Sequence, residues 1–147
     1  MNTRSIIYAI IVTASLVNMS TSIAEDMVVL PDVKTDNGIQ YISGGIGSDE
    51  VTAMKEASKD YALMLICSVQ DSGKYLADVK ISITDKTGTV VLDTVIDGPI
   101  LLAQLSPGQY RVSADSNGVV VNKTVQIGAS RPVKLNLYWP AQPGNEQ

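Results

Sequence analysis

The sequence contains no histidine and no phenylalanine, and its 147 residues include one cysteine and one tryptophan. Histidine is the usual general base near neutral pH and the commonest metal ligand. Its absence excludes Ser-His-Asp triads, Cys–His pairs and histidine-bearing zinc sites. A zinc site built from cysteines alone also fails with a single cysteine. The sequence therefore predicts a protein that is not an enzyme and that holds no metal or cofactor.

Basic residues are also scarce, with Lys+Arg 11 against Asp+Glu 15 and a formal net charge of −4. A nucleic-acid interface needs clustered lysine and arginine to displace counterions from phosphates. The acidic balance argues against nucleic acid as a partner. The length is that of one domain, since domains commonly hold about 100–150 residues.

Long apolar runs are rare, and the run at the start of the chain is too short to span a bilayer. Residues 1–24 combine a basic start at Arg4, an apolar run over 6–17 and a small-residue end at Ala24, which is the pattern of a secretory signal peptide. The run holds about 12 residues, whereas a membrane-spanning helix needs about 20. We expect a periplasmic or secreted protein with no stable membrane insertion after cleavage. An uncleaved anchor is the alternative.

The single cysteine, Cys67, lies in the continuous apolar run 63–69. It cannot form an intramolecular disulfide, although export would allow one. A free thiol in such a run most often acts as a small buried hydrophobe, because the run lacks the cationic or helix-terminal neighbours that lower a cysteine pKa. We expect Cys67 to be buried, and a reactive or dimer-forming thiol is the alternative.

The start of the exported chain predicts a lead-in, a short strand and one helix. Residues 25–38 show no clear period and are expected to form a loose lead-in, followed by a short strand over 39–42. Ser48, with the carboxylates that follow it, is expected to cap a helix over 49–60 at the positive end of the helix dipole. The apolar stripe of this helix consists of Val51, Met54, Ala57, Ser58 and Tyr61.

From residue 62 onward the apolar period becomes that of strands, with turn-forming residues between short runs. The predicted strands are 62–69, 77–84, 89–95, 100–105, 109–115, 119–127 and 133–139. Seven such strands after one short helix predict a mainly β fold, a Greek-key sandwich of the immunoglobulin or transthyretin-like kind. The single domain is expected to cover 39–139, with a flexible tail over 140–147.

Tyr110 stands at the start of a predicted strand, just after the Pro107-Gly108 corner. This is the setting of a tyrosine corner, in which the hydroxyl bonds to the backbone a few residues upstream. We therefore interpret Tyr110, Pro107 and Gly108 as structural residues.

Part of the chain resembles a known class of domain. In 100–115 an apolar strand, a Leu-Ser-Pro-Gly-Gln-Tyr corner, a Val-x-Ala strand and a glycine hairpin follow one another, as in the carboxypeptidase regulatory-like domains of the transthyretin-like sandwich class. The fuller arrangement, over about 41–139, resembles a group of small exported bacterial proteins with no established activity. The segments that carry it are 41–47, 60–63, 73–79, 97–99 and Tyr138-Trp139. The resemblance implies a compact β-rich periplasmic protein and no particular function.

Some transthyretin-like sandwiches hydrolyse hydroxyisourate with histidines and an arginine. This chain has no histidine to take that role and ends without the carboxy-terminal motif of that family. The resemblance therefore does not extend to that activity.

Three other site hypotheses are weaker than structural interpretations of the same residues. The glycine-rich loop 44–47 precedes a helix and invites anion binding, but Asp49 and Glu50 place negative charge there. Lys80 and Asn136 are spaced for an isopeptide crosslink, yet both are expected to face outward. Aspartates near strand ends match no calcium-loop spacing and are explained by turns. They are Asp71, Asp78, Asp85, Asp93, Asp97 and Asp115.

Strand edges and exposed aromatic rings remain as means of binding. Tyr75, Tyr138 and Trp139 are the candidates for ligand or partner contact, although Trp139, the largest filler in the chain, is expected in the core. We expect an exported non-enzymatic module that binds another envelope protein through a strand edge or loop end. The alternative is a glycan-binding module that uses these rings. A third hypothesis is an enzyme that uses paired carboxylates, but no such pair can be located in the sequence.

Overall fold

A computed structural model describes residues 29–141, and every structural statement below concerns that part of the chain. The signal peptide predicted over 1–24 lies outside it, as do residues 142–147 of the predicted tail. The described part contains the whole of the predicted domain 39–139.

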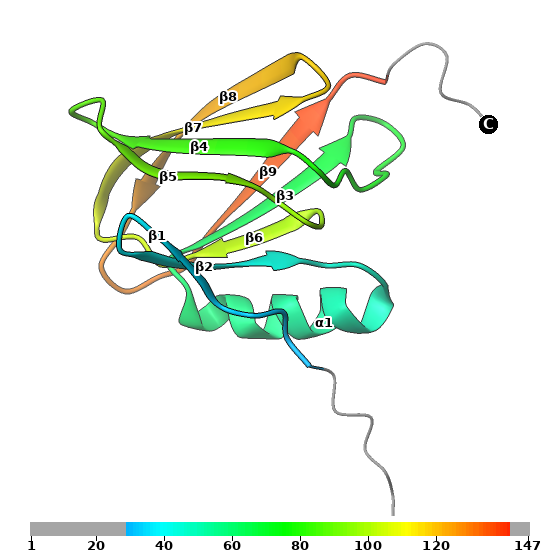
Figure 1. Cartoon of the computed structure of the whole chain (residues 1–147), viewed down its shortest axis with the longest axis horizontal. Helices are drawn as coiled ribbons and strands as arrows, with labels where there is room; N and C mark the ends of the chain where they lie inside the picture. Colours follow the sequence, from blue (N-terminus) through cyan, green and yellow to red (C-terminus); the bar gives the residue numbers. More distant parts are fainter. Residues whose placement is uncertain (1–28, 142–147) are drawn as a thin grey trace, which may run out of the picture.

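Two sheets pack face to face as a sandwich (Figure 1). Sheet A has five strands in the order β1-β2-β6-β3-β9, and sheet B has four in the order β5-β4-β7-β8. Hydrogen-bonded neighbours are antiparallel, except that β3 and β9 are parallel. The strands are β1 (Lys34–Asp36), β2 (Ile39–Gly44), β3 (Leu63–Val69), β4 (Lys80–Asp85), β5 (Val90–Val95), β6 (Ile100–Ala103), β7 (Gly108–Ser116), β8 (Val119–Ile127) and β9 (Val133–Trp139).

The predicted mainly β sandwich is confirmed. The nine strands in the described residues are the seven predicted from residue 62 onward, the short strand predicted over 39–42, which is β2, and β1. Residues 34–36, inside the predicted loose lead-in, form β1. Asn37 and Gly38 both adopt positive φ, 47° and 80°, and turn the chain back in a tight hairpin onto β2. The lead-in prediction is wrong at this point. β4 also begins at Lys80 rather than at Ala77.

Several strands that are neighbours in a sheet are far apart in sequence. β6 lies between β2 and β3, β9 lies beside β3, and β7 lies beside β4. The chain passes through sheet B between β3 and β6 and again between β6 and β9. Such pairing of non-consecutive strands is the connectivity expected of Greek-key sandwiches.

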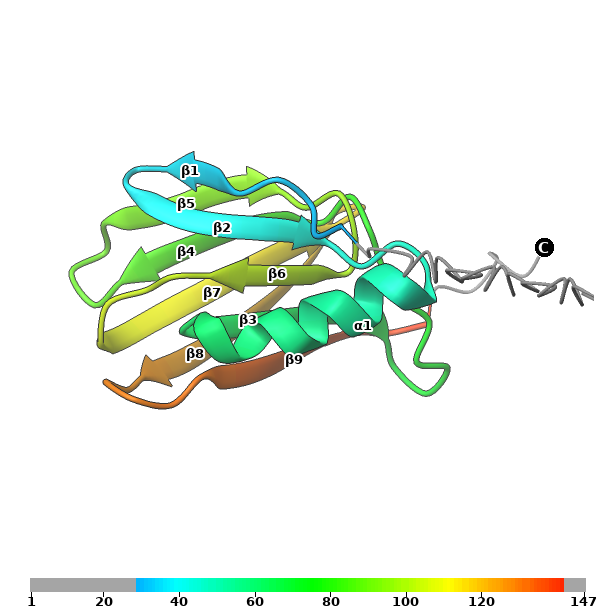
Figure 2. The same ribbon diagram turned by 90° about the horizontal axis from the view of Figure 1, so that it is seen from below.

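The predicted helix is confirmed as α1 (Ser48–Ala57), which continues into a short 3-10 helix, η1 (Ser58–Asp60). α1 lies across the outer face of sheet A (Figure 2) and adds a third layer to the sandwich. Met54 from the predicted apolar stripe is fully buried there, and Val51, Ala57 and Tyr61 pack around it. No helix among residues 29–141 is long and apolar enough to cross a bilayer.

β3 is buried on both of its faces. Successive side chains on a strand point to opposite faces. Leu63, Leu65 and Cys67 point into the main core between the two sheets, whereas Met64 and Ile66 point toward α1. All four residues of β6 are buried as well. The centre of sheet A is thus sealed by sheet B on one side and by α1 on the other.

Two glycines bring the end of β2 against the connection between β5 and β6. A Cβ atom added to Gly98 would overlap the carbonyl group of Gly44, and one added to Gly44 would overlap the Glu50 carboxylate and the Pro31 ring. Backbone cannot give way as a flexible side chain can. This contact therefore requires glycine at position 98, where the added atom would meet backbone, whereas one at position 44 would meet side-chain atoms.

We predict that Gly98→Ala lowers the free energy of unfolding by about 1–3 kcal/mol, because the new methyl group must displace the backbone of Gly44. Gly128→Ala is the matched control, since nothing lies within 4 Å of its added Cβ. The control should change stability by no more than about 0.5 kcal/mol. Urea unfolding of both variants measures the difference, and equal stability would contradict the predicted contact.

Candidate functional site

The glycine-rich loop before α1 binds a carboxylate of the chain itself. Oε1 of Glu50 accepts hydrogen bonds from the backbone amides of Gly45, at 2.7 Å, and Ile46, at 3.2 Å. The amides that an external phosphate would need are therefore occupied, as the negative charge in this segment led us to expect. The predicted Ser48 cap is wrong. Gly47 is the N-cap residue, at φ 84°, with no side-chain hydrogen bond, and Ser48 is already helical.

The side of the sandwich formed by β1 and β5 is closed by polar contacts. Oδ2 of Asp36 accepts a hydrogen bond from the amide of Asp93 at 3.0 Å, which occupies an outward-facing group of β5. The hydroxyls of Tyr41 and Thr94 are 3.0 Å apart and join the two sheets. A strand added to β5 would have to displace Asp36.

An ion pair lies at the end of this closed side. Nζ of Lys34 and Oδ2 of Asp97 are 2.5 Å apart, and the Ser43 hydroxyl donates to the same oxygen at 3.1 Å. The hydrogen bond from Lys34, and then that from Ser43, lowers the pKa of the Asp97 carboxyl group, and the same contact raises the pKa of Lys34. Both side chains are largely exposed, so the pair contributes little to stability.

The opposite side of the sandwich, formed by β8 and β9, is closed mainly by apolar side chains. Val119 and Val121 of β8 and Val133 and Leu135 of β9 are half-buried against the main core. At one end, Nε1 of Trp139 donates to the carbonyl oxygen of Val119 at 2.8 Å. We call this the β8–β9 side. It is the side on which both sheets end in a long strand.

β9 presents unpaired backbone groups along the β8–β9 side. The amide of Val133 donates to the carbonyl of Ala62, and the carbonyl of Trp139 accepts from the amide of Gln70, so both residues face the strand β3. The N–H and C=O of one residue point to the same side of a strand, and this direction alternates along it. Those of the intervening residues Lys134, Asn136 and Tyr138 therefore point away from β3, where sheet A has no further strand.

β8 has a free edge as well, but its inner face carries a charge. Lys123 is paired with the buried Val112 of β7, so its side chain starts from the face that points toward sheet A. A charge pointing inward on an edge strand opposes pairing with another strand, because that strand would bury the charge. The free edge of β9 is therefore better suited than that of β8 to accept an extended segment.

Two of the predicted contact residues lie in one row on the outer face of sheet A. Ser68 pairs with Tyr138 across the β3–β9 ladder and with Tyr75 through a bridge on its other side. Paired residues share a face, so the two rings flank Ser68 with their Cα atoms about 9–10 Å apart. Tyr75 is 45% and Tyr138 52% exposed, while Ser68 is buried. This tyrosine row lies one step beyond Ile66, on which α1 packs.

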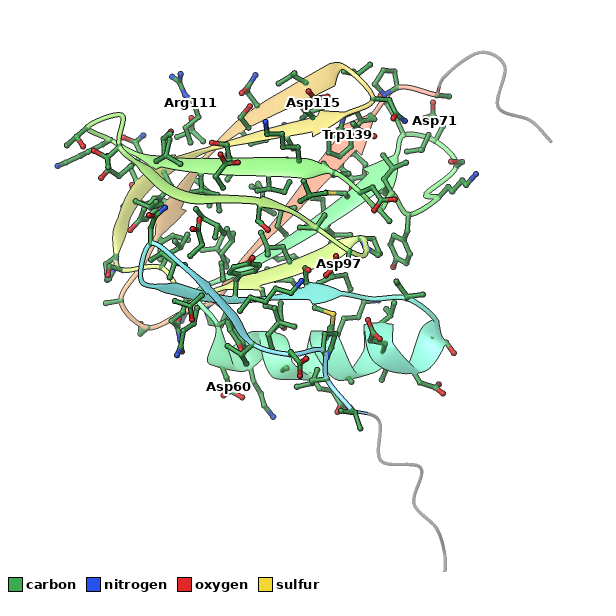
Figure 3. All side chains as sticks on the ribbon, in the orientation of Figure 1. Asp60, Asp71, Asp97, Arg111, Asp115 and Trp139 are labelled. Carbon is green, nitrogen blue, oxygen red and sulfur yellow. The ribbon has the colours of Figure 1, made fainter. Side chains whose placement is uncertain are left out.

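The position of Trp139 rules it out as a residue that contacts a ligand or partner. Its side chain is buried in the main core, as its size led us to expect, and its indole nitrogen is hydrogen-bonded to β8 (Figure 3). The ring is not available to stack on a ligand.

The residues predicted to be structural have structural contacts. The Tyr110 hydroxyl donates to the carbonyl oxygen of Ser106 at 2.8 Å, which is the hydrogen bond of a tyrosine corner, and the tyrosine is buried. Burial raises the pKa of this hydroxyl. Pro107 and Gly108 form the corner itself, with Gly108 as the first residue of β7.

Four of the six aspartates predicted near strand ends hold turns or bends, whereas Asp93 lies inside β5 and Asp97 forms the ion pair with Lys34. Oδ1 of Asp85 accepts hydrogen bonds from the amides of Thr87 and Thr89, and Oδ1 of Asp115 accepts one from the amide of Gly118. Asp71 and Asp78 adopt positive φ, at 67° and 57°. Among residues 29–141 no three His, Cys, Asp or Glu side chains gather where they could hold a metal ion. Lys80 lies on the outer face of sheet B and Asn136 on the outer face of sheet A, so the two side chains point away from each other and cannot be crosslinked.

No protein-family model matches this chain, and no curated protein matches its sequence. Function does not follow from a sandwich fold alone, since one fold hosts many activities. The candidate functional features of this helix-covered β-sandwich are the free edge of β9 and the tyrosine row.

We predict that Cys67 does not react in the folded protein. Its side chain is fully buried, and this burial raises the pKa of the thiol to about 12, so almost no thiolate exists at neutral pH. A chromogenic disulfide reagent should label the native protein negligibly and one thiol per chain after unfolding in guanidinium. Rapid stoichiometric labelling of the native protein would show that the thiol is accessible.

Proposed function

We propose that the protein is an exported, non-enzymatic binding module that accepts an extended segment of another envelope protein along the free edge of β9. The observation that carries this proposal is the row of outward-facing N–H and C=O groups of Lys134, Asn136 and Tyr138. Such groups are a template for an added strand, whose main-chain hydrogen bonds supply affinity.

The surroundings of this edge favour an alternating segment. Inward-pointing side chains of an added strand would contact the half-buried Val133 and Leu135, and those of Val119 and Val121 across the sandwich. Outward-pointing side chains would lie beside Asn136 and the exposed Tyr138. A segment with apolar residues at every second position would therefore gain burial on one face and contact with polar and aromatic groups on the other.

Location and chemistry are part of the proposal. The signal-peptide pattern of residues 1–24 supports export to the periplasm or beyond. The resemblance to small exported bacterial proteins with a carboxypeptidase regulatory-like domain supports the same location. A chain without histidine, whose one cysteine is buried, offers few groups for catalysis.

Asn136→Pro tests the proposal directly. Proline removes an N–H that points away from β3, and a proline is tolerated on an edge strand where this N–H faces solvent. The ladder between β3 and β9 stays intact. We expect the variant to remain folded and to bind its partner at least about tenfold more weakly, because it loses a donor and places a ring in the path of the added strand.

The matched control is Asn136→Ala, which keeps the backbone amide. Affinity purification from an envelope extract, followed by titration of the recovered protein, measures the binding of each form. Wild type and Asn136→Ala should recover one specific protein that Asn136→Pro does not. Equal recovery by Asn136→Pro, or recovery of no specific protein by the wild type, would refute binding at this edge.

The tyrosine row favours a second function, glycan binding. Two exposed rings on one face, with the Ser68 hydroxyl between them, offer apolar surfaces on which sugar rings stack and a polar group that can form a hydrogen bond. A glycan would contact side chains of the tyrosine row, whereas an added strand would form hydrogen bonds with backbone groups of β9. The two functions can therefore be separated by mutation.

We predict that Tyr75→Ala and Tyr138→Ala each weaken glycan binding severalfold or more, since each removes one stacking surface. Val120→Ala is the control, because Val120 is 51% exposed but lies on sheet B. A glycan array followed by calorimetry on the best ligand measures the effect. The glycan proposal is refuted if the array shows no ligand or if both tyrosine variants bind as the wild type does.

A further inference from the structure

The outer face of sheet B carries an arginine between two threonines. Arg111 of β7 pairs with Thr84 of β4 on one side and with Thr124 of β8 on the other. The three side chains therefore leave the sheet on one face and in one row. Figure 3 shows Arg111 projecting from sheet B away from sheet A. A guanidinium group thus stands between two hydroxyl groups that can donate hydrogen bonds in the same direction.

Arg111 has no carboxylate partner in the described residues. The one ion pair found between residues 29 and 141 joins Lys34 and Asp97, which lie elsewhere. Asp115 is on the same strand and face as Arg111, but four residues of extended chain place their Cα atoms about 13 Å apart. The guanidinium group is therefore left to solvent or to a ligand.

This row lines a surface hollow of about 410 Å³ at the turn between β4 and β5. A volume of this size is within the range of small-molecule sites, about 300–1,000 Å³. Besides the row, it is bordered by the turn residues Asp85–Gly88 and by Gln109 and Tyr110. Most of these residues present polar groups, so a ligand there would be held by hydrogen bonds and charge rather than by apolar contact.

The charges in the hollow favour an anion. Lys86 and Arg111 are the two cations that border it, and Asp85 is the one carboxylate. Oδ1 of Asp85 is already bonded to the turn, accepting from the amide of Thr87 at 2.9 Å, from its hydroxyl at 2.5 Å and from the amide of Thr89 at 3.1 Å. The hollow is thus a cationic site on a chain with a net charge of −4.

We infer that this hollow binds the carboxylate or phosphate group of a small anionic ligand, with Arg111 as its main contact and the hydroxyls of Thr84 and Thr124 beside it. The forked guanidinium matches the geometry of both anions and forms two parallel hydrogen bonds with either. Lys86 adds a second positive charge on the turn. This site lies on sheet B and does not depend on strand addition at β9 or on the tyrosine row.

The test compares Arg111→Gln with Arg131→Gln. Both remove one exposed arginine and change the net charge equally, but Arg131 lies in the loop before β9 and not in the hollow. Nitrogen-15 NMR titrations of the full exported chain with inorganic phosphate and, separately, with citrate are made at constant ionic strength. Urea unfolding checks that both variants are folded.

We expect saturable shifts of residues 84–88, 109–111 and 124 in the wild type and in Arg131→Gln, and at least about tenfold weaker binding by Arg111→Gln, because a charge-assisted pair of hydrogen bonds is lost. Saturation with phosphate alone or citrate alone supports the site and identifies the anion. Equal affinity in Arg111→Gln, or shifts that do not saturate and spread over every lysine and arginine, would overturn the inference. Asn136→Pro should bind the anion as the wild type does. The anion site is thereby distinguished from the proposed partner site at the β9 edge.

Discussion

The burial of β3 on both faces is the constraint on which the rest of the structure depends. A strand in an ordinary two-layer sandwich has one face toward the core and one toward water, and its side chains alternate accordingly. β3 instead reads as a continuous apolar run from Leu63 to Cys67, so each face needs its own cover. Sheet B covers Leu65 and its inward neighbours, and α1 covers Met64 and Ile66. A third layer therefore follows from the run itself.

The same constraint determines where the molecule is left open. α1 covers the outer face as far as Ile66, so the next row, with Ser68 at its centre, is left to Tyr75 and Tyr138. Because the parallel strand β9 is the last strand of sheet A, every second residue of it directs backbone groups to solvent. The two candidate surfaces meet at Tyr138, which supplies a ring to the row and an amide to the edge. A bound strand would therefore change the surroundings of the tyrosine row.

Local sequence patterns predicted most of the helix and strands, whereas the pairing of strands distant in sequence determined which residues lie together on one surface. The stripe around Met54 predicted α1, and alternation predicted β8 and β9 with their observed ends. Asn-Gly is the common signal of a two-residue hairpin, and it stands both at Asn117-Gly118, between β7 and β8, and at Asn37-Gly38, where it could have predicted β1. The unbroken apolar run of β3 could have predicted that the helix covers it. No local signal joins Tyr75 to Tyr138, because only the pairing of β3 with strands distant in sequence places them in one row.

The four strand edges differ in a way that bears on function. A free edge invites aggregation, so proteins shorten it, cover it or place a charge on it. β1 has three residues, Asp36 occupies an amide of β5, and β8 carries Lys123 on its inner face. The inner face of β9 holds only apolar residues, from Val133 to Trp139, beside half-buried valines of β8, and its one charge, Lys134, lies on the outer face. The edge of β9 is therefore the least protected of the four, and this difference is the structural basis on which we propose it as the edge that a partner covers.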